Sequence, residues 1–380
     1  MDLSPQLALN SNTREEEEVF VASPRKLMWW KFRKHKMAVV AVIFLVVVYF
    51  CAIFSEFVAP YDPFAFSARY TYLPPQAIHL LDENGRLQFP FTYEINKQRD
   101  PETFALTYTE DTTKPKHYLR FFVTGAPYKL WGLIPSDIHL FGVDPAVDNG
   151  TLFLMGTDSM GRDVFSRVIF GARISMSVSL VGTFLSLVLG IFLGGLSGYF
   201  GGWIDMLVQR MIELFQSIPT LPLWMGLAAA IPLSWDPLTV YFLITIILSL
   251  ISWTGMARVV RGRFLSMREE DFVMAAKLLG AGDLRIIINH MVPSFLSHII
   301  AVTTLTIPEL ILSETALSFI GLGLRPPVVS WGVLLQDAQN VSSIALAPWL
   351  LLPALFLVLT IVAFNFFGDG LRDAADPYVR

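Results

Sequence analysis

The sequence predicts an all-α polytopic membrane protein with six transmembrane helices, into which a small β-rich external domain is inserted. Of the 380 residues, 54% are hydrophobic and only 16% are charged, and the mean hydropathy is +0.54. This composition is far more apolar than that of a soluble protein of the same size. Six apolar segments are each close to the roughly 20 residues that a helix needs to cross a bilayer. These segments are residues 37–58, 174–200, 206–232, 239–260, 292–316 and 346–368.

The N-terminal tail, residues 1–36, is polar and precedes the first apolar segment, 37–58. Basic residues crowd directly before that segment, and such an excess marks the cytoplasmic side of a membrane helix. No small-residue cleavage site follows the segment, so we expect it to remain as a membrane anchor rather than to be removed as a signal peptide. The basic residues are Arg25, Lys26, Lys31, Arg33, Lys34 and Lys36.

The region 59–155 is less apolar and is rich in aromatic residues, proline and aspartate. Its dipeptide Asn84-Gly85, between residues 78–81 and 86–93, is a typical β-hairpin turn. We therefore expect a small β-rich insertion on the external, periplasmic side. A loosely ordered loop is the alternative, because the region also contains many prolines and turn-forming residues.

Residues 156–380 are expected to form a five-helix core with one long cytoplasmic loop, 261–291. Six crossings return both termini to the cytoplasm, and the loop between the fourth and fifth crossings lies there too. Basic residues in and beside this loop agree with that orientation, because cytoplasmic loops carry an excess of Lys and Arg. They are Arg258, Arg261, Arg263, Arg268, Lys277 and Arg285.

The cytoplasmic loop contains a short amphipathic helix pattern. Ser266 and Glu269 have the spacing of a capping box, and Gly280 and Gly282 supply a stop signal at the other end. We predict that the apolar face of this helix docks into a groove on another protein. A helix that lies on the membrane surface is the alternative that the same pattern allows. The apolar residues at i, i+3, i+4 and i+7 are Phe272, Ala275, Ala276 and Leu279.

Motifs of enzymes and metal sites are missing from the sequence. No Gly-Lys dipeptide occurs, so the chain has no Walker A phosphate loop for ATP. Cys51 is the only cysteine, which excludes an intrachain disulfide and a cysteine-rich zinc site. The histidines are scattered, so we expect no metal site. The two basic stretches flank membrane segments and do not indicate nucleic-acid binding.

Charged residues inside the apolar segments are costly to bury in hydrocarbon and are therefore candidates for function. Arg210 and Glu213 are three residues apart and are expected to pair within one helix. Glu309 and Glu314 lie in the fifth crossing. Each has two interpretations that the sequence leaves open: it lines a hydrated pathway, or it forms hydrogen bonds across a helix interface.

Small residues and prolines mark where the helices are expected to pack closely or to bend. Gly194 and Gly198 form a Gly-x-x-x-Gly pair, which permits close contact within the chain or with a second, similar chain. Prolines within the apolar segments can kink helices. They are Pro219, Pro222, Pro308 and Pro353.

Several motifs, in their order along the chain, give it a resemblance to a known family. The chain resembles the permease subunits of binding-protein-dependent ABC importers, and specifically the second permease of the oligopeptide, dipeptide and nickel group. The motifs that carry the resemblance are Gly156–Asp163 (GTDSMGRD), Gly198–Gly202, Ala275-Ala276-x-x-x-Gly280 with Pro293, Glu314–Gly323, Ser330-Trp331-Gly332 and Gly368–Asp373.

The resemblance implies a non-enzymatic transport subunit of the bacterial cytoplasmic (inner) membrane. Its expected partners are a second homologous permease, two ATPase subunits and an extracytoplasmic solute-binding protein. No cofactor is expected in this chain, because ATP and Mg²⁺ would be bound by the ATPase subunits. Peptides are the expected cargo, with nickel complexes, opines and oligosaccharides as alternatives. The residues implied in coupling to the ATPase are Asp271, Phe272, Ala275, Ala276, Leu279, Gly280, Gly282 and Pro293.

Two departures from the family pattern are visible: the insertion at 59–155 is much longer than usual, and Met274 stands where the family motif typically has Glu. The alternative function is a self-contained secondary transporter that is coupled to protons through Glu309 or Glu314. Ala276→Asp, which would place a charge on the expected docking face, is predicted to reduce association with the ATPase.

Overall fold

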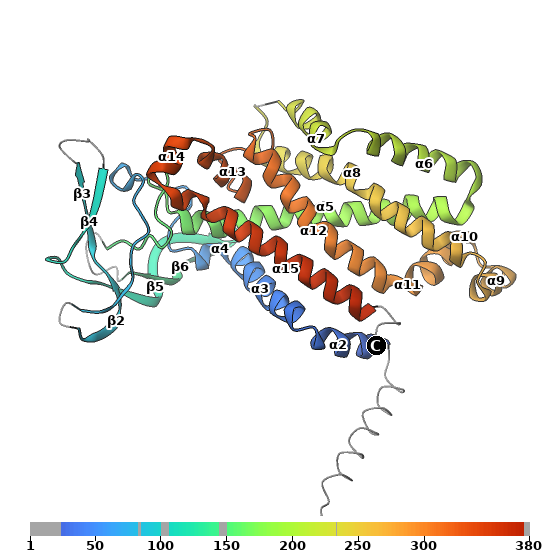
Figure 1. Ribbon diagram of the computed structural model, residues 1–380, viewed down its shortest axis with the longest axis horizontal. Coiled ribbons are helices and arrows are strands. Elements are labelled where there is room, and N and C mark those ends of the chain that lie inside the picture. The colour runs from blue at the N-terminus through green and yellow to red at the C-terminus, as the bar shows by residue number, and fades with distance from the viewer. Residues whose placement is uncertain (1–23, 83–84, 100–105, 144–149, 233, 376–380) are drawn as a thin grey trace, which may run out of the picture.

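The structure is a computed structural model that describes residues 24–82, 85–99, 106–143, 150–232 and 234–375. The molecule is elongated, with β strands at one end, a short helix, α9 (Asp271–Leu278), at the other, and long helices between them (Figure 1). The long helices are α3 (Lys36–Ile53), α5 (Val164–Phe200), α8 (Pro237–Met267), α12 (Leu296–Phe319) and α15 (Leu352–Ala375).

The shorter elements connect these helices or extend their ends. A single π-helical turn, η2 (Ile287–Met291), precedes α12. The short α helices are α2 (Pro24–Lys34), α4 (Ser55–Val58), α10 (Asp283–Ile286), α11 (Val292–Ser294), α13 (Trp331–Gln336) and α14 (Val341–Leu346). The 3-10 turns are η1 (Ala68–Tyr70), η3 (Asp337–Gln339) and η4 (Pro348–Leu351).

Among the described residues, five helices are long and apolar enough to cross a membrane, rather than the six predicted. The expected third crossing consists instead of two shorter helices, α6 (Gly202–Ser217) and α7 (Thr220–Ala229). The break follows from Pro219, which lacks a backbone N–H and sterically opposes a continuous helix. Neither piece alone reaches the roughly 20 residues of a regular membrane span.

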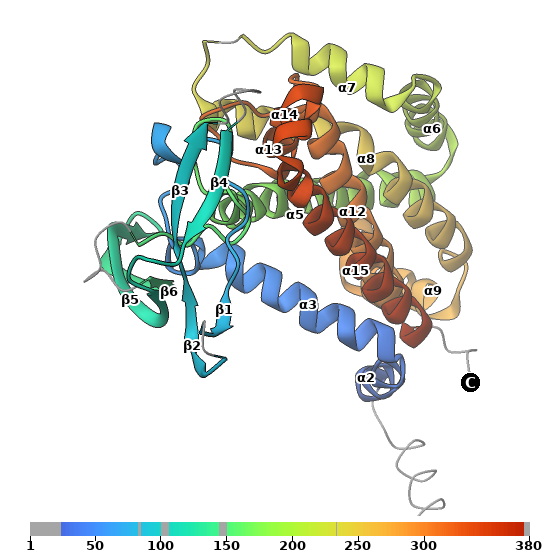
Figure 2. The same ribbon diagram turned by 60° about the vertical axis from the view of Figure 1, so that its left-hand side comes forward.

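The path of α6 and α7 follows from the packing of their neighbours. Gly182 lies beside Thr245, and Gly198 lies beside Arg261, so α5 and α8 run in the same direction. The chain must therefore return along the length of the bundle between these two helices. Figures 1 and 2 show α6 and α7 following one another along the outer side of α8.

The Gly-x-x-x-Gly pair packs within the chain, which was one of its two interpretations. A side-chain Cβ at Gly194 would lie 2.4 Å from the carbonyl oxygen of Ala257, and one at Gly198 would lie 2.7 Å from that of Arg261. Both distances are too short for any residue with a side chain. The two glycines therefore allow α5 and α8 to approach each other at backbone distance.

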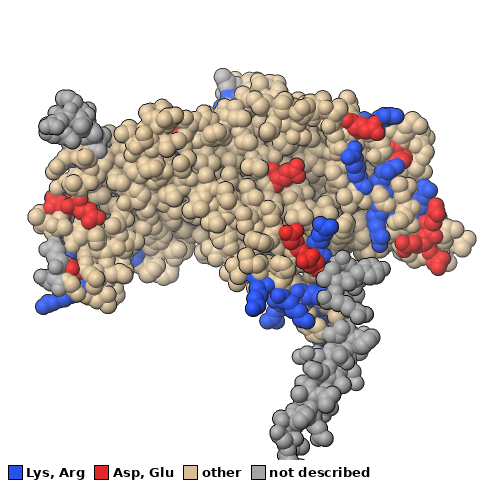
Figure 3. Space-filling view, viewed as in Figure 1, with Lys and Arg blue, Asp and Glu red and all other residues tan. Residues whose placement is uncertain are grey.

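Charged residues gather toward the two ends of the molecule. On the face shown in Figure 3, Lys, Arg, Asp and Glu concentrate at the ends, and a broad middle band is almost free of them. α2 and the C-terminal end of α15 lie toward the same end as α9, opposite the β strands (Figures 1 and 2). This distribution fits a helical bundle that crosses an apolar layer.

The inserted region contains two small sheets. A four-stranded sheet has the order β1 (His79–Leu81), β2 (Leu87–Thr92), β5 (His117–Leu130) and β6 (Ile134–Val143). A separate antiparallel hairpin joins β3 (Glu94–Arg99) to β4 (Leu106–Asp111). The predicted hairpin is confirmed, because β1 and β2 pair antiparallel and Gly85 has a φ of 71°. Asn84 lies outside the described residues.

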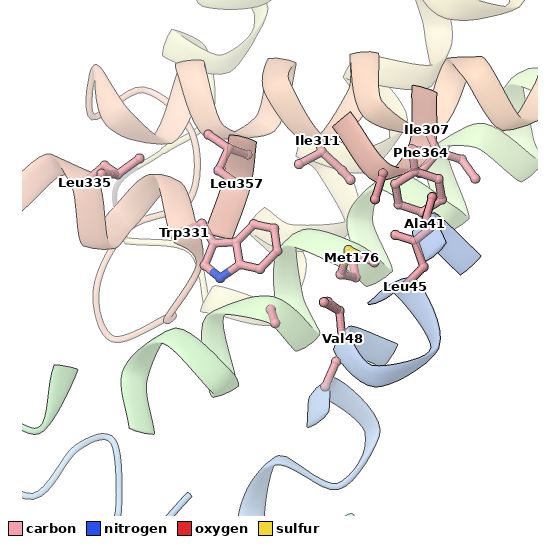
Figure 4. Packing of buried hydrophobic residues seen from close by; sticks show 13 residues of the cluster. Ala41, Leu45, Val48, Met176, Ile307, Ile311, Trp331, Leu335, Leu357 and Phe364 are labelled. Atoms are coloured by element: carbon pink, nitrogen blue, oxygen red, sulfur yellow. The ribbon is translucent and has the colours of Figure 1, made fainter. Parts of the chain in front are cut away.

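The largest core cluster holds the membrane helices together (Figure 4). Trp331 at the start of α13 is 1% exposed, and its Nε1 donates a hydrogen bond to the carbonyl oxygen of Val168 in α5 at 3.1 Å. Apolar side chains from α3, α5, α12 and α15 complete the cluster. They include Leu45, Met176, Ile311, Leu357 and Phe364.

The motif Gly156–Asp163 forms a buried junction in front of α5. The Asp158 carboxylate accepts hydrogen bonds from Arg162 Nε and Arg167 Nη1, both at 2.7 Å. Asp163 caps α5 by accepting from the backbone N–H of Ser166 at 2.8 Å. Complete burial raises the pKa of Asp163 to about 7, because the charged form loses its hydration.

Candidate coupling surface

The N-terminus of α9 differs from the predicted capping box. α8 continues through Ser266 to Met267, and the Ser266 hydroxyl donates to the carbonyl oxygen of Arg263 within that helix. α9 begins only at Asp271, after Glu270, whose side chain forms no capping hydrogen bond. The capping-box prediction is therefore wrong, because α8 continues to Met267, about two turns beyond the predicted end of the crossing at residue 260.

The C-terminus of α9 ends at a glycine, as predicted. Gly280 has a φ of 80°, a left-handed conformation that residues with a Cβ rarely adopt. Its N–H donates to the carbonyl oxygen of Lys277 at 2.9 Å, and the N–H of Ala281 donates to that of Ala276 at 3.1 Å. These two bonds form a Schellman motif, which stops the helix sharply.

The inner face of α9 packs on the end of the helical bundle. Val273 and Ala276 are buried against a cluster that includes Phe264, Ile286 and Met291. The predicted position of Ala276 on the docking face is therefore wrong. Because α9 carries two overlapping apolar stripes, the sequence pattern assigned Ala276 to the outer stripe. A charge at position 276 would be buried in this cluster and would test stability rather than docking.

The outer face of α9 consists of Phe272, Ala275, Leu278 and Leu279, all of which are exposed. Leu278 is 86% exposed and Leu279 is 88% exposed. α9 itself lies at the end of the molecule opposite the β strands (Figure 1). Adjacent apolar side chains that are almost fully exposed are a feature of protein interaction sites. Asp271 begins the same helix and is also exposed.

A polar helix end separates α9 from the apolar part of α8. α8 has 31 residues and is therefore about 46 Å long, whereas the hydrocarbon core is about 30 Å thick. Three arginines occupy its last ten residues, where charged side chains mark the aqueous end. α9 follows after this polar end, which favours docking on a protein over a helix at the membrane surface. The arginines are Arg258, Arg261 and Arg263.

Tyr199, near the end of α5, fixes α9 and the segment after it to the bundle. Its hydroxyl donates a hydrogen bond to Asp283 Oδ1 at 2.7 Å. Its ring faces the Lys277 ammonium, with 4.9 Å between Nζ and the ring centroid. The two contacts lie on either side of the turn at Gly280, so Tyr199 holds both arms of that turn.

A second polar contact joins the ends of α5, α6 and α8. Arg261 donates to both oxygens of Asp205, with Nε to Oδ1 at 2.5 Å and Nη2 to Oδ2 at 2.7 Å. Ser197 Oγ donates to the same Oδ1 at 2.5 Å. Hydrogen bonds from the Arg261 guanidinium lower the pKa of Asp205, which therefore stays ionised at neutral pH.

The remaining predicted coupling residues lie in the segment that leads from α9 into α12. Gly282 is the N-cap of α10 and has an ordinary φ of −67°. Pro293 is exposed in α11, directly after the π-helical turn η2. Gly282 therefore begins α10 just beyond the turn at Gly280, whereas Pro293 lies further along the chain, after α10 and η2.

Glu314 accepts a hydrogen bond across the interface between α12 and α5. It is fully buried, and its carboxylate accepts hydrogen bonds from Ser175 in α5 at 2.9 Å and from Ser318 and Ser330 at 2.8 Å each. Each serine oxygen also accepts a backbone N–H, from Trp331, Leu324 and Val333 respectively. Each hydroxyl therefore directs its single proton to the carboxylate, so the network fits an acceptor at position 314.

Glu309 has a different environment, although it is only five residues away on α12. Its side chain is exposed on the surface of the chain. Across the described part of the chain, we find no ion pair or hydrogen bond to its carboxylate.

The predicted pairing of Arg210 with Glu213 within one helix is confirmed, because Arg210 Nη1 lies 2.6 Å from Glu213 Oε2 in α6.

The sequence missed Tyr199, Asp283 and Leu278. Tyr199 belongs to the motif Gly198–Gly202, but its partner Asp283 is 84 residues away, so no local pattern connects them.

The described residues contain no group of three or more His, Cys, Asp or Glu that could hold a metal ion.

Comparisons with known proteins agree with these features. The model of the family described as "Binding-protein-dependent transport system inner membrane component" matches residues 186–380. A second model, "N-terminal TM domain of oligopeptide transport permease C", matches residues 23–75. The two models thus cover the first long helix and most of the helical core.

Curated relatives extend the similarity. The oligopeptide transport system permease protein OppC of Haemophilus influenzae is 39% identical over 265 residues, which are 69% of this chain and 82% of the relative. The dipeptide transport system permease protein DppC of Bacillus subtilis is 40% identical over 59% of this chain and 68% of its own length. DppC of Lactococcus lactis is 33% identical over 92% of this chain and 89% of its own length.

Among solved structures, an inward-facing conformation of the MetNI methionine ABC transporter matches 55% of this chain and 97% of its own chain, with 18% identity and a TM-score of 0.44. The family models and the curated relatives establish the assignment. The chain belongs to the family of inner-membrane permease components of binding-protein-dependent transport systems.

Proposed function

We propose that this chain is the second permease subunit of an ABC importer for peptides. The cargo is inferred from the oligopeptide and dipeptide permeases among its relatives. In this proposal, two homologous permeases form the pathway, two ATPase subunits bind and hydrolyse ATP with Mg²⁺, and an extracytoplasmic solute-binding protein delivers the peptide. This chain itself carries no cofactor and performs no hydrolysis.

The outer face of α9 is the proposed contact with an ATPase subunit. The observation that carries this proposal is the nearly complete exposure of Leu278 and Leu279 at the end of the molecule opposite the β strands. Two exposed leucines on a short helix suit a hydrophobic groove, which is a common way for one protein to recognise a helix of another. Phe272 and Ala275 extend the same contact.

Movement of the ATPase pair would be transmitted from α9 to the helices of the pathway. Tyr199 links both arms of the α9 turn to α5, and the Arg261–Asp205 pair links α8 to α6. Displacement of α9 would therefore carry the ends of several helices with it. Such rigid contacts convert closure of the ATPase pair into a shift between inward-open and outward-open states.

The proposed topology has six crossings, with α6 and α7 together forming the third. The parallel directions of α5 and α8 support this, because the chain must return between them. We take both termini and α9 to be cytoplasmic, because α2 and the end of α8 are rich in basic residues. The β strands then lie on the external side, where the solute-binding protein would dock.

Glu309 is proposed to face the second permease or the hydrated pathway. An exposed carboxylate on an apolar span is too costly to leave against lipid chains. Glu314, which is surrounded by serine hydroxyls, is assigned to helix packing instead. The three serine contacts support this assignment, so Glu309 is the exposed carboxylate of the two that the secondary-transporter alternative names.

Transport by defined vesicles tests the function. Vesicles that contain both permeases, the ATPase subunits and ATP, with the binding protein outside, are expected to accumulate peptide. Vesicles that contain this chain alone, with an imposed proton gradient, are expected to accumulate none. Uptake against a gradient by the chain alone would contradict the proposal and would favour the secondary transporter.

A further inference from the structure

The tip of the β5–β6 hairpin lies against the end of the first long helix. Trp131 Nε1 donates a hydrogen bond to the carbonyl oxygen of Ile53, the last residue of α3, at 2.8 Å. The centroid of a Trp131 ring lies 5.5 Å from that of Phe54, which in turn lies 5.0 Å from that of Phe50. A row of aromatic rings therefore connects the hairpin tip to the side of α3.

The position of Ile53 fixes the depth of the tip. α3 has 18 residues and is about 27 Å long, close to the thickness of the hydrocarbon core. At its C-terminal end, Arg173 donates to the carbonyl oxygen of Ile53 at 2.9 Å and to the Glu56 carboxylate at 2.5 Å and 2.7 Å. These charged groups mark the level at which α3 leaves the hydrocarbon, and Trp131 is bonded at that level.

The tip itself is apolar and exposed. Leu133 is 79% exposed, and Trp131 and Ile134 are each about half exposed, at 50% and 53%. Phe50 and Ile53, on the adjoining surface of α3, are also exposed. The exposed apolar residues at the end of α3 and at the hairpin tip are thus joined through the Phe54–Trp131 contact, and Lys129 beside the tip is exposed.

The backbone of the tip supports a specific role for its tryptophan. Trp131 has a φ of 53° and Gly132 a φ of 74°. The left-handed conformation is natural for glycine but costs a residue with a bulky side chain about 1–2 kcal/mol. A strained tryptophan, held in place by a hydrogen bond to Ile53, is more than an incidental surface residue.

We propose that residues 129–134 insert into the headgroup region of the lipid bilayer, in the leaflet on the side of the β strands. Tryptophan prefers this region because its ring is apolar and its N–H needs a partner. Leu133 and Ile134 would reach the boundary of the acyl chains, and Lys129 would extend its ammonium to a lipid phosphate. The hairpin would then fix the height of the β strands above the membrane.

Site-specific fluorescence quenching by lipids tests this placement. Because Cys51 is the only cysteine, Cys51→Ala provides a cysteine-free background for Leu133→Cys or Leu87→Cys. Leu87, in β2, is also 79% exposed and makes a matched control within the same region. Each variant would be labelled with an environment-sensitive nitrobenzoxadiazole dye and assembled as the full transporter in phosphatidylethanolamine–phosphatidylglycerol nanodiscs.

The proposal predicts that lipids with a nitroxide near the headgroup quench the dye at position 133 much more strongly than the dye at position 87, with emission at 133 shifted to the blue. If emission at position 133 were as red-shifted as in water and the nitroxide lipids did not quench it, the tip would lie in water and the proposal would be overturned. Blue emission without lipid quenching would also overturn it, because another subunit would then cover the tip. Unchanged gel-filtration profiles and peptide transport would confirm that both variants are folded.

Discussion

The Tyr199 hydroxyl donates a hydrogen bond to Asp283 Oδ1 at 2.7 Å and thereby joins the end of α5 to the segment that follows α9. The same ring faces Lys277 within α9. One side chain thus holds the two arms of the turn that presents Leu278 and Leu279. If α9 transmits force, this contact must keep it from moving independently of the bundle.

Tyr199→Phe should loosen the α9 segment without unfolding the chain. The ring, and with it the contact with Lys277, is retained, whereas the loss of the hydrogen bond should cost about 1 kcal/mol. Hydrogen–deuterium exchange should accelerate for the amides of 271–283 and remain unchanged in β5 and β6. Equal exchange in the variant and the parent would show that this bond does not fix α9.

Gly280→Ala and Gly282→Ala form a matched pair on either side of Ala281. Alanine at position 280 must adopt a φ near 80°, which costs about 1–2 kcal/mol, although no neighbouring atom obstructs its Cβ. Alanine at position 282 has the same open space and an ordinary φ. Trypsin should therefore cleave after Lys277 faster in the first variant only. Similar cleavage rates would contradict the proposed cap.

Glu314→Gln and Glu309→Gln should separate a packing role from a role in the pathway. At position 314 the new NH₂ group would face a serine proton, so the variant should lose roughly 1–3 kcal/mol of stability. At position 309 the side chain is exposed, and stability should stay within about 0.5 kcal/mol of the parent. Urea denaturation in detergent measures both. Glu314→Gln with parental stability would exclude the network as a structural element.

Asp163 should make the folding stability depend on pH. Its pKa is raised to about 7 in the folded chain, against about 3.9 when unfolded, so the folded state binds the proton more tightly. Stability from this group is complete below about pH 4 and is lost as the pH rises through about 7, by up to about 1.4 kcal/mol per pH unit. Asparagine at position 163 would remove the titrating group and keep the cap of α5, because Asn caps helices about as well as Asp.

The measurement is the pH dependence of the free energy of unfolding in Asp163→Asn and in the parent. Other groups titrate in both proteins, so the difference between the two curves isolates position 163. The variant should gain stability relative to the parent as the pH rises from about 4 to about 7. A difference that does not change with pH would show that Asp163 is ionised throughout.

The sequence predicted those features whose physical cause is local. Gly280 ends α9 because only the left-handed conformation closes that turn, and Gly85 lies in the turn of the β1–β2 hairpin for the same reason. The five long helices follow from apolar segments that are long enough to span a bilayer. In each case the residues that set the structure are neighbours in the chain.

Features that depend on distant contacts could not be predicted in the same way. Ala276 faces inward because it lies on the same side of α9 as Val273, and that side packs against Phe264 and Met291 at the end of the helical bundle. Glu314 meets Ser175 across a separation of 139 residues. The break at Pro219 has a local signal in the proline itself, but the apolar length of 206–232 by itself predicts a single crossing.

Leu279→Asp tests the central claim most directly, because it adds a charge to the outer face of α9 while the buried side of the helix stays intact. Leu87→Asp is the control, since Leu87 is 79% exposed at the opposite end of the molecule. The measurement is the amount of ATPase subunit that co-purifies with the tagged permease. Leu279→Asp should strongly reduce the amount of co-purified ATPase, whereas Leu87→Asp should leave it unchanged. Full retention of the ATPase by Leu279→Asp would show that the outer face of α9 is not the contact.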